Sequence, residues 1–155
     1  MKIGARLYYY RVVIGHKIVV FYYTLKFCKR LLGRALKHDL RKFSEDEVII
    51  VAPALRQFKT LIYGTNAYSE MCDDVRMALA THYARNTHHP EHFTKFDHDH
   101  HMTLLDRIEM VIDWAAASRK GVGVFRSIGI NETRFGFDKQ QKQEYIDIAK
   151  AIEGK

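Results

Sequence analysis

HYARNTHHPEHF, residues 82–93, is the most informative stretch of this 155-residue sequence, because it holds four of the chain's nine histidines. Helical spacing of apolar residues fades after residue 85, and Pro90 follows, so a helix over 67–85 is predicted to end here in an irregular loop over 86–101. Imidazoles gathered at the end of a helix are typical ligands of divalent metals. A single proton donor would not need so many of them. The stretch therefore favours a metal site.

Carboxylates lie in two other stretches, HDLRKFSEDE at 38–47 and MTLLDRIEMVIDW at 102–114, and the first of these also contains one imidazole, His38. Asp113 stands in an apolar helical run, where an unpaired carboxylate would be costly to bury, so a partner is expected for it. Asp106, seven residues earlier on the same face, is the alternative ligand, or serves only as a helix cap. His16 precedes all of these residues in the chain.

Periodicity and capping signals predict an all-α fold in a single domain over residues 1–155, with five or six helices. Capping-box spacings occur at 44–47, 103–106 and 138–141. No segment alternates like a strand between hairpin turns, although 122–125 could form a short extended piece. A buried, aromatic-rich first helix is expected near the front, bent or ended at Gly33. The predicted helices span 15–32, 45–63, 67–85, 103–119 and 138–152.

Charge is concentrated at the front of the chain. Residues 1–42 contain eleven Lys and Arg against one acid, whereas the whole chain contains 25 bases and 18 acids. Such a basic segment attracts phosphates of a nucleotide, a nucleic acid or a membrane surface, unless it is simply a solvated helix face. The two cysteines form no CxxC motif, which excludes a disulfide framework and favours a reducing cytoplasm.

The apolar stretch 3–27 does not predict stable insertion into a membrane. Lys and Arg interrupt it, and its longest uncharged run is well short of the ~18 apolar residues that a spanning helix needs. Tyr8, Tyr9 and Tyr10 would suit an interface between copies, so a homo-oligomer is a possible partner arrangement.

The order His16, His38-Asp39, His82, Asp113 resembles the HD superfamily of metal-dependent phosphohydrolases. The three stretches quoted above also resemble a small phage and bacterial HD-like family with the pattern HD-x-x-KF…HY-x-x-N-x-HHPEH…EM-x-x-DW, over most of residues 16–135. This resemblance implies a single HD-like helical bundle. It also implies a location in the cytoplasm, which is the host cytoplasm if a phage encodes the chain.

The resemblance implies one or two divalent ions as cofactors (Mn, Fe, Co, Ni, Mg or Zn). The metal ligands it implies are His16, His38, Asp39, His82, His89 and Asp113. Because successive side chains of an extended loop point apart, only one of His88 and His89 is expected to bind metal and the other to face substrate, and His92 is a further alternative. The spacing from His82 to His88 is short for a two-metal enzyme, so the number of ions stays open.

Asp39 and Lys42 are the expected catalytic residues, since Lys42 belongs to the family's HD-x-x-K form, in which the lysine faces the substrate phosphate. The residues expected to bind substrate are Lys42, Arg41, His88, Arg119, Asn131 and Arg134. The predicted activity is hydrolysis of a nucleotide or related phosphoester by a metal-activated water. The alternatives are a di-iron oxygenase and a non-catalytic basic helical protein that binds nucleic acid or a protein partner. A serine hydrolase is excluded because no GxSxG occurs.

Overall fold

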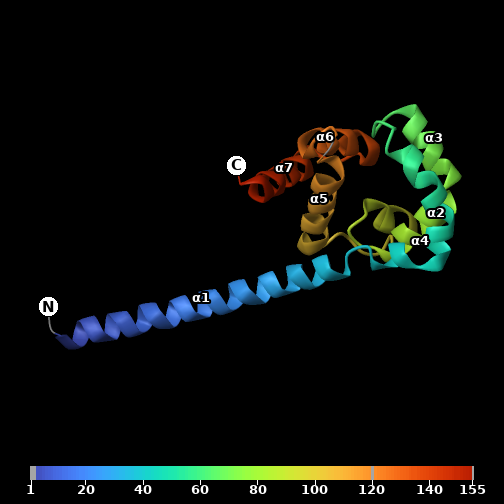
Figure 1. Ribbon diagram of the computed structural model, residues 1–155. Coiled ribbons are helices and arrows are strands. Elements are labelled where there is room, and N and C mark those ends of the chain that lie inside the picture. Colours follow the sequence, from blue (N-terminus) through green and yellow to red (C-terminus); the bar gives the residue numbers. More distant parts are fainter. Residues whose placement is uncertain (1–2, 120, 155) are drawn as a thin grey trace. The chain divides into compact units, whose positions relative to one another are not determined.

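The computed structural model describes residues 3–119 and 121–154, which form helices and no strand (Figure 1). The all-α prediction is confirmed. The chain divides into two compact units, Met1–His38 and Asp39–Lys155. The helices are α1 (Ile3–Lys37), the 3-10 turn η1 (Leu40–Phe43), α2 (Glu45–Phe58), α3 (Asn66–Asp74), α4 (Arg76–Arg85), the π-helical turn η2 (His92–Phe96), α5 (Leu104–Ser118), α6 (Val124–Phe135) and α7 (Lys139–Glu153).

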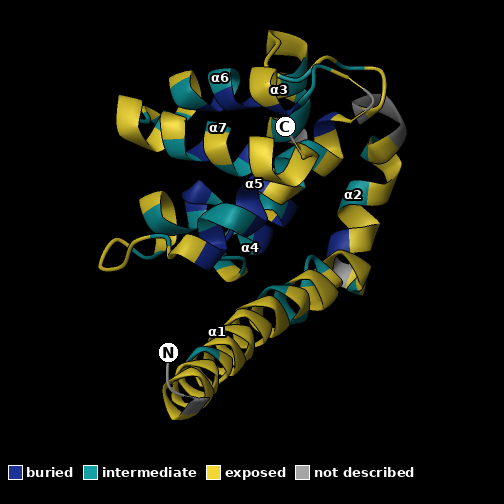
Figure 2. Cartoon of the chain, turned by 90° about the vertical axis from the view of Figure 1, so that its left-hand side faces the viewer, coloured by how far each residue is buried: buried dark blue, intermediate teal, exposed yellow. Residues whose placement is uncertain are grey.

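The first unit consists of α1, a single helix of 35 residues. It extends beyond the predicted 15–32 at both ends and passes through Gly33, where a helical glycine costs only about 1 kcal/mol relative to alanine. Most of its side chains are exposed, which contradicts the predicted buried first helix (Figure 2). Within the described residues, no helix combines the length and the apolar character needed to cross a membrane.

The core of the second unit lies between α5, α6 and α7, which pack against one another (Figures 1 and 2). Tyr145 from α7 is 1% exposed, and its ring meets Trp114 and Phe137 edge-on. This packing sets the orientation of α5, and with it the direction of the face that carries the predicted acids. The fully buried members of the cluster are Met110, Val111, Val124, Ile128, Tyr145 and Ala149.

A second group of helices, α2, α3 and α4, packs together in the same unit, with η1 against α2 and η2 against α4. The predicted helix over 67–85 is divided here. Val75 leaves helical geometry, with φ −103° and ψ 16°, and separates α3 from α4. Its side chain is 3% exposed, so burial of Val75 accompanies the break. This division and α6 raise the number of helices above the predicted five or six.

Two of the three predicted capping boxes are confirmed, and each opens a helix. At α5 the Thr103 side chain accepts from the Asp106 amide and the Asp106 side chain accepts from the Thr103 amide. Asp138 and Gln141 make the same exchange at α7. Reciprocal bonds of this kind satisfy amides that have no partner within the helix, which explains why these two helices begin where the sequence predicts.

Candidate metal centre

Asp39 begins the second unit in an unusual backbone conformation. Its φ is 55° and its ψ is 20°, and it is the one non-glycine residue with positive φ among the described residues. Asp tolerates this left-handed region better than most side chains because it is short and polar, and such residues cluster at functional sites. The turn into η1 at Leu40 thus fixes the direction of the Asp39 carboxylate.

Three imidazoles gather around this carboxylate. His82 Nε2 lies 3.3 Å from Asp39 Oδ1 and 2.8 Å from His89 Nε2, and His88 Nε2 lies 3.7 Å from the same carboxylate oxygen. Each of the four residues offers one ligand atom, and these atoms all lie within 4.8 Å of one another. We call Asp39, His82, His88 and His89 the histidine group.

The histidine group combines donor types that suit a divalent transition metal. Imidazole nitrogen and carboxylate oxygen bind such ions at about 2.0–2.2 Å, so four donors less than about 5 Å apart can surround one ion. His82 is 3% and His88 is 2% exposed, which keeps competing water away. The donor set and its spacing therefore fit a metal ion.

His88 and His89 both belong to the histidine group, contrary to the expectation that they point apart. Residues 87–89 form a turn ahead of a helical Pro90, not an extended loop. The two rings consequently lie close, with centroids 4.2 Å apart. The alternation of side chains that holds for extended backbone does not apply to this turn.

Two further carboxylates, which the sequence does not single out as site residues, face the outer side of the imidazoles. Glu47 Oε1 lies 3.5 Å from His82 Nδ1, and Glu109 Oε1 lies 3.4 Å from His88 Nδ1. Both glutamates are 8% exposed. The sequence predicts Glu47 only as part of a capping box, whereas Ser44 Oγ donates to the Arg41 carbonyl. We call Glu47 and Glu109 the outer carboxylates.

The two candidate aspartates of α5 have different roles. Asp106 is committed to the cap of α5 and also accepts from Thr87 Oγ1 at 2.6 Å. Asp113 lies within 4.8 Å of a ligand atom of His88. Glu109 and Asp113 are four residues apart and therefore share one face of α5. Asp113 is the better candidate ligand of the two, in line with the preference drawn from the sequence.

Among the remaining predicted residues, Lys42 Nζ donates to the Asp39 carboxylate. Arg41 and Arg119 are exposed. His92 makes contacts of its own, since its Nδ1 lies 3.0 Å from the Tyr83 carbonyl oxygen. Its Nε2 lies 3.8 Å from Asp97 Oδ2, so both ring nitrogens face groups other than the histidine group.

His16 and His38 belong to the first unit. His16 is exposed on α1, and His38 is the residue that follows α1, bonded directly to Asp39 in the chain. Their assignment as ligands stays a prediction.

Arg134 and Asn131 take part in a polar network on α6. Arg134 Nη2 donates to Glu91 Oε1 at 2.6 Å and Nη1 to the Tyr63 hydroxyl at 3.3 Å, and that hydroxyl donates to Asn131 Oδ1 at 2.7 Å. Asn131 is 1% exposed, and its Nδ2 has no hydrogen-bond partner among the described residues. Tyr68 packs edge-on against Tyr63, and burial, with Cys72 and Tyr63 nearby, raises the pKa of Tyr68 to about 12.

Arg134→Gln is expected to destabilise the protein, because Glu91 is 3% exposed and would lose its charge partner. Breaking a fully buried ion pair costs about 3–5 kcal/mol, and the 44% exposure of Arg134 reduces the expected loss to roughly 1–3 kcal/mol. Urea unfolding measures it. Arg126→Gln, an exposed position on the same helix, is the control and should change stability by less than about 0.5 kcal/mol. Equal effects of the two changes would contradict a structural role for the Glu91 ion pair.

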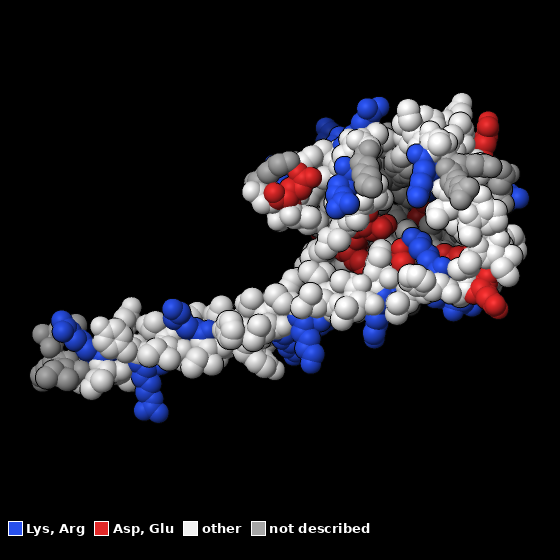
Figure 3. Space-filling view, viewed as in Figure 1, with Lys and Arg blue, Asp and Glu red and all other residues white. Residues whose placement is uncertain are grey.

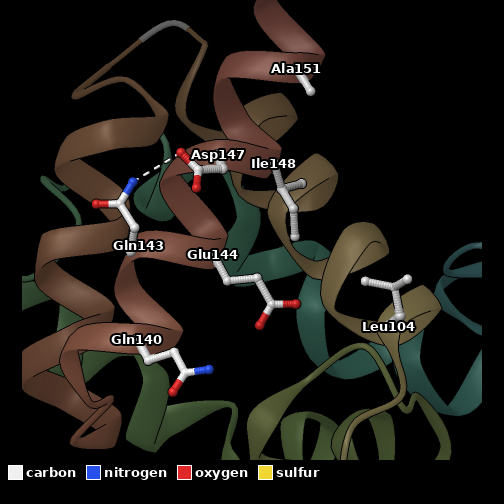
Figure 4. A pocket seen from close by; sticks show the side chains of 7 residues that line it. All are labelled: Leu104, Gln140, Gln143, Glu144, Asp147, Ile148 and Ala151. Carbon is white, nitrogen blue, oxygen red and sulfur yellow. Dashed lines mark hydrogen bonds between the residues drawn. The ribbon is translucent and has the colours of Figure 1, made fainter.

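Acidic side chains gather in a hollow of the second unit, between α5 on one side and α2 and α4 on the other (Figure 3). The histidine group and the outer carboxylates come from these helices and the turns that adjoin them. A separate open groove runs along α7 to the first residue of α5 (Figure 4) and contains no member of the histidine group. Its lining residues are Leu104, Gln140, Gln143, Glu144, Asp147, Ile148 and Ala151.

An all-α protein with a buried group of histidines and aspartate that could hold a metal ion is the class that these observations define. The chain belongs to DUF5662, a family of unknown function, whose match covers residues 5–153. No curated protein and no solved structure matches it.

Proposed function

We propose that this chain is a metal-dependent phosphohydrolase of the HD type, which cleaves a nucleotide or a related phosphoester. The observation that carries the proposal is the convergence of Asp39, His82, His88 and His89 within 4.8 Å, in a buried part of the second unit. Two of the three imidazoles, His82 and His88, are buried beside the carboxylate, an arrangement that a bound metal would stabilise. The order His16, His38-Asp39, His82, Asp113 along the sequence also resembles that superfamily.

A divalent ion bound by the histidine group would supply a nucleophilic water near neutral pH and a positive charge for the phosphoryl oxygens. Asp113, close to His88, is proposed as a further ligand. His16 and His38 are proposed from the resemblance. One or two ions are compatible with this donor set, and Mn, Fe, Co, Ni, Mg and Zn are the candidates.

Lys42 is proposed to balance negative charge on the substrate. Its ammonium contacts the Asp39 carboxylate and its side chain is 53% exposed, so it can reach a phosphate that approaches from solvent. A cation placed there stabilises charge that develops during phosphoryl transfer. His88 is assigned here to the histidine group and not to the substrate. The side chains proposed to bind the parts of the substrate other than the reacting phosphate are those of Arg41, Arg119, Asn131 and Arg134.

The basic first unit is proposed to attract the anionic substrate. Bases occur along the whole of α1 while no acid occurs in it (Figure 3). A surface that carries charge of one sign raises the local concentration of oppositely charged molecules and the rate at which they associate with the protein. Salt weakens this effect. The proposed compartment is the cytoplasm.

Metal content and turnover test the proposal on the full chain. We expect purified protein to retain a divalent metal by elemental analysis and to release phosphate, or a phosphomonoester, from at least one member of a panel of nucleoside mono- and triphosphates and cyclic dinucleotides. Oxygen consumption by the iron-loaded chain, with no hydrolysis, would favour the oxygenase instead. Salt-sensitive nucleic-acid binding with no turnover across the panel would favour the non-catalytic binder.

A further inference from the structure

Each of two buried imidazoles lies between the Asp39 carboxylate and a second carboxylate. His82 has Nε2 3.3 Å from Asp39 Oδ1 and Nδ1 3.5 Å from Glu47 Oε1. His88 has Nε2 3.7 Å from the same Asp39 oxygen and Nδ1 3.4 Å from Glu109 Oε1. The arrangement occurs twice, with one outer carboxylate from α2 and the other from α5. We infer that Glu47 and Glu109 are positioning residues that hold His82 and His88 with Nδ1 protonated and Nε2 directed at a metal ion.

The chemistry of neutral imidazole supports this assignment. The ring has one N–H donor and one lone pair, and the hydrogen bond at one nitrogen decides which tautomer is present. A carboxylate accepts only, so it favours the proton on the nitrogen that faces it. Both nitrogens of each ring face a carboxylate, and a cation bound by Asp39 would take the place of the proton at Nε2, so the proton would stay on the Nδ1 that faces Glu47 or Glu109. The other nitrogen is then free to bind a cation, and the partner carboxylate makes it a stronger ligand.

The distances leave room for the contact to tighten. At 3.4 and 3.5 Å the two pairs are at the outer limit of a hydrogen bond, and a shift of about 0.5 Å brings each to the usual ~2.9 Å. A cation bound by Nε2 of both rings would fix the orientation of the rings. The shortening of the two Nδ1–carboxylate distances depends on that orientation. The outer carboxylates are thus placed to orient the rings, not to reach the cation themselves.

Burial supports the same role. At 8% exposure each, Glu47 and Glu109 would be unfavourable as carboxylates without positive charge nearby. Asp39, Glu47 and Glu109 bring three carboxylates to the two rings. A divalent cation among the Nε2 atoms would offset this charge.

A competing partner exists at one of the two rings. Asn86 Nδ2 lies 3.4 Å from His82 Nδ1, and an amide hydrogen given to that nitrogen would favour the opposite tautomer. The same amide nitrogen donates one of its two hydrogens to the His82 carbonyl oxygen at 2.7 Å, and the charged Glu47 carboxylate, at 3.5 Å from Nδ1, is a stronger partner for that ring nitrogen than the second amide hydrogen. We therefore assign the His82 Nδ1 proton to Glu47.

Glu47→Gln and Glu109→Gln test the inference, which rests on the proposed metal site but not on the proposed reaction. Each change keeps the side-chain shape and removes the charge. We expect each to weaken Zn²⁺ or Mn²⁺ binding about 10–100-fold, the usual cost of losing an outer partner of a metal-bound histidine. Competition with a calibrated chelator measures the affinity. Glu144→Gln is the control, since Glu144 pairs with Arg107 outside the histidine group, and should leave the affinity within about twofold.

A second measurement needs no variant. In the Zn²⁺-loaded wild-type chain, long-range ¹H–¹⁵N spectra should show His82 and His88 protonated at Nδ1 and coordinated at Nε2. Coordination through Nδ1, or unchanged metal affinity in both folded glutamine variants, would overturn the inference and leave the proposed hydrolysis standing. Metal binding as expected without phosphoester turnover would overturn the hydrolysis and leave the inference standing. A wild-type chain that binds no divalent metal overturns both.

Discussion

Asp39→Asn is expected to abolish phosphoester hydrolysis and to weaken divalent-metal binding by more than the ~10–100-fold that loss of an outer partner costs. Asp39 is the residue that His82 and His88 share, since both Nε2 atoms face its Oδ1. Asparagine keeps the shape of the side chain and tolerates the left-handed backbone found here, so the substitution removes the charge without a new steric demand. A hydrolase that depends on its metal should lose at least about 10³-fold in kcat/KM.

Elemental analysis and a hydrolysis assay on the same preparation measure both effects. Asp73→Asn is the matched control, because Asp73 is an exposed aspartate in the same unit and should keep full metal content and activity. Full metal content in Asp39→Asn would remove Asp39 from the ligands. Retained metal with lost turnover would instead make Asp39 a catalytic group that acts on substrate or water. Retained metal and retained turnover would contradict both proposed roles.

Asp39, His82 and His89 of the histidine group could be predicted as metal ligands from the sequence because the relevant residue types are rare and unevenly placed, whereas His88 was expected to face substrate. Four of nine histidines fall within residues 82–93, and an acid follows a histidine at 38–39. Such clustering is by itself an indication of metal chemistry. The capping boxes at α5 and α7 could also be predicted from the sequence, because their hydrogen bonds lie within four residues of chain.

The role of the outer carboxylates could not be predicted from the sequence in the same way. A glutamate three residues after Ser44 is typical of a cap, and nothing local reveals that Glu47 instead lies beside His82, 35 residues later in the chain. For Glu109 a signal did exist. It stands four residues before Asp113, so one face of α5 presents two acids, and a buried carboxylate such as that of Glu109 needs a partner.

Helix α6 was missed because its pattern contains polar and flexible residues. Its buried positions, Val124, Ser127, Ile128 and Asn131, recur at helical spacing, but two of the four are polar. Gly129 lowers helix propensity further, and Gly123 just precedes the helix. Tertiary packing of Ile128 and Val124 against α5 and α7 stabilises what local propensity alone would not.

His88→Ala is expected to remove the stabilisation that a bound metal gives the fold, whereas His92→Ala should leave it intact. His88 belongs to the histidine group and also lies close to Asp113, while the ring nitrogens of His92 face the Tyr83 carbonyl and Asp97. A ligand present at about 100 times its Kd stabilises the folded state by about 2.7 kcal/mol. At the same metal concentration the His88 variant should keep only a small part of that gain, because its Kd rises.

Urea unfolding of the full chain with Zn²⁺ and then with a chelator measures this difference for each variant. Comparing the two conditions within one variant cancels the cost of the cavity left by His88, which is 2% exposed. A His88 variant that gains as much stability from metal as the wild type would assign the cation to Asp39, His82 and His89 alone. Loss of the gain in His92→Ala would instead place His92 among the ligands, which its contacts with Tyr83 and Asp97 oppose.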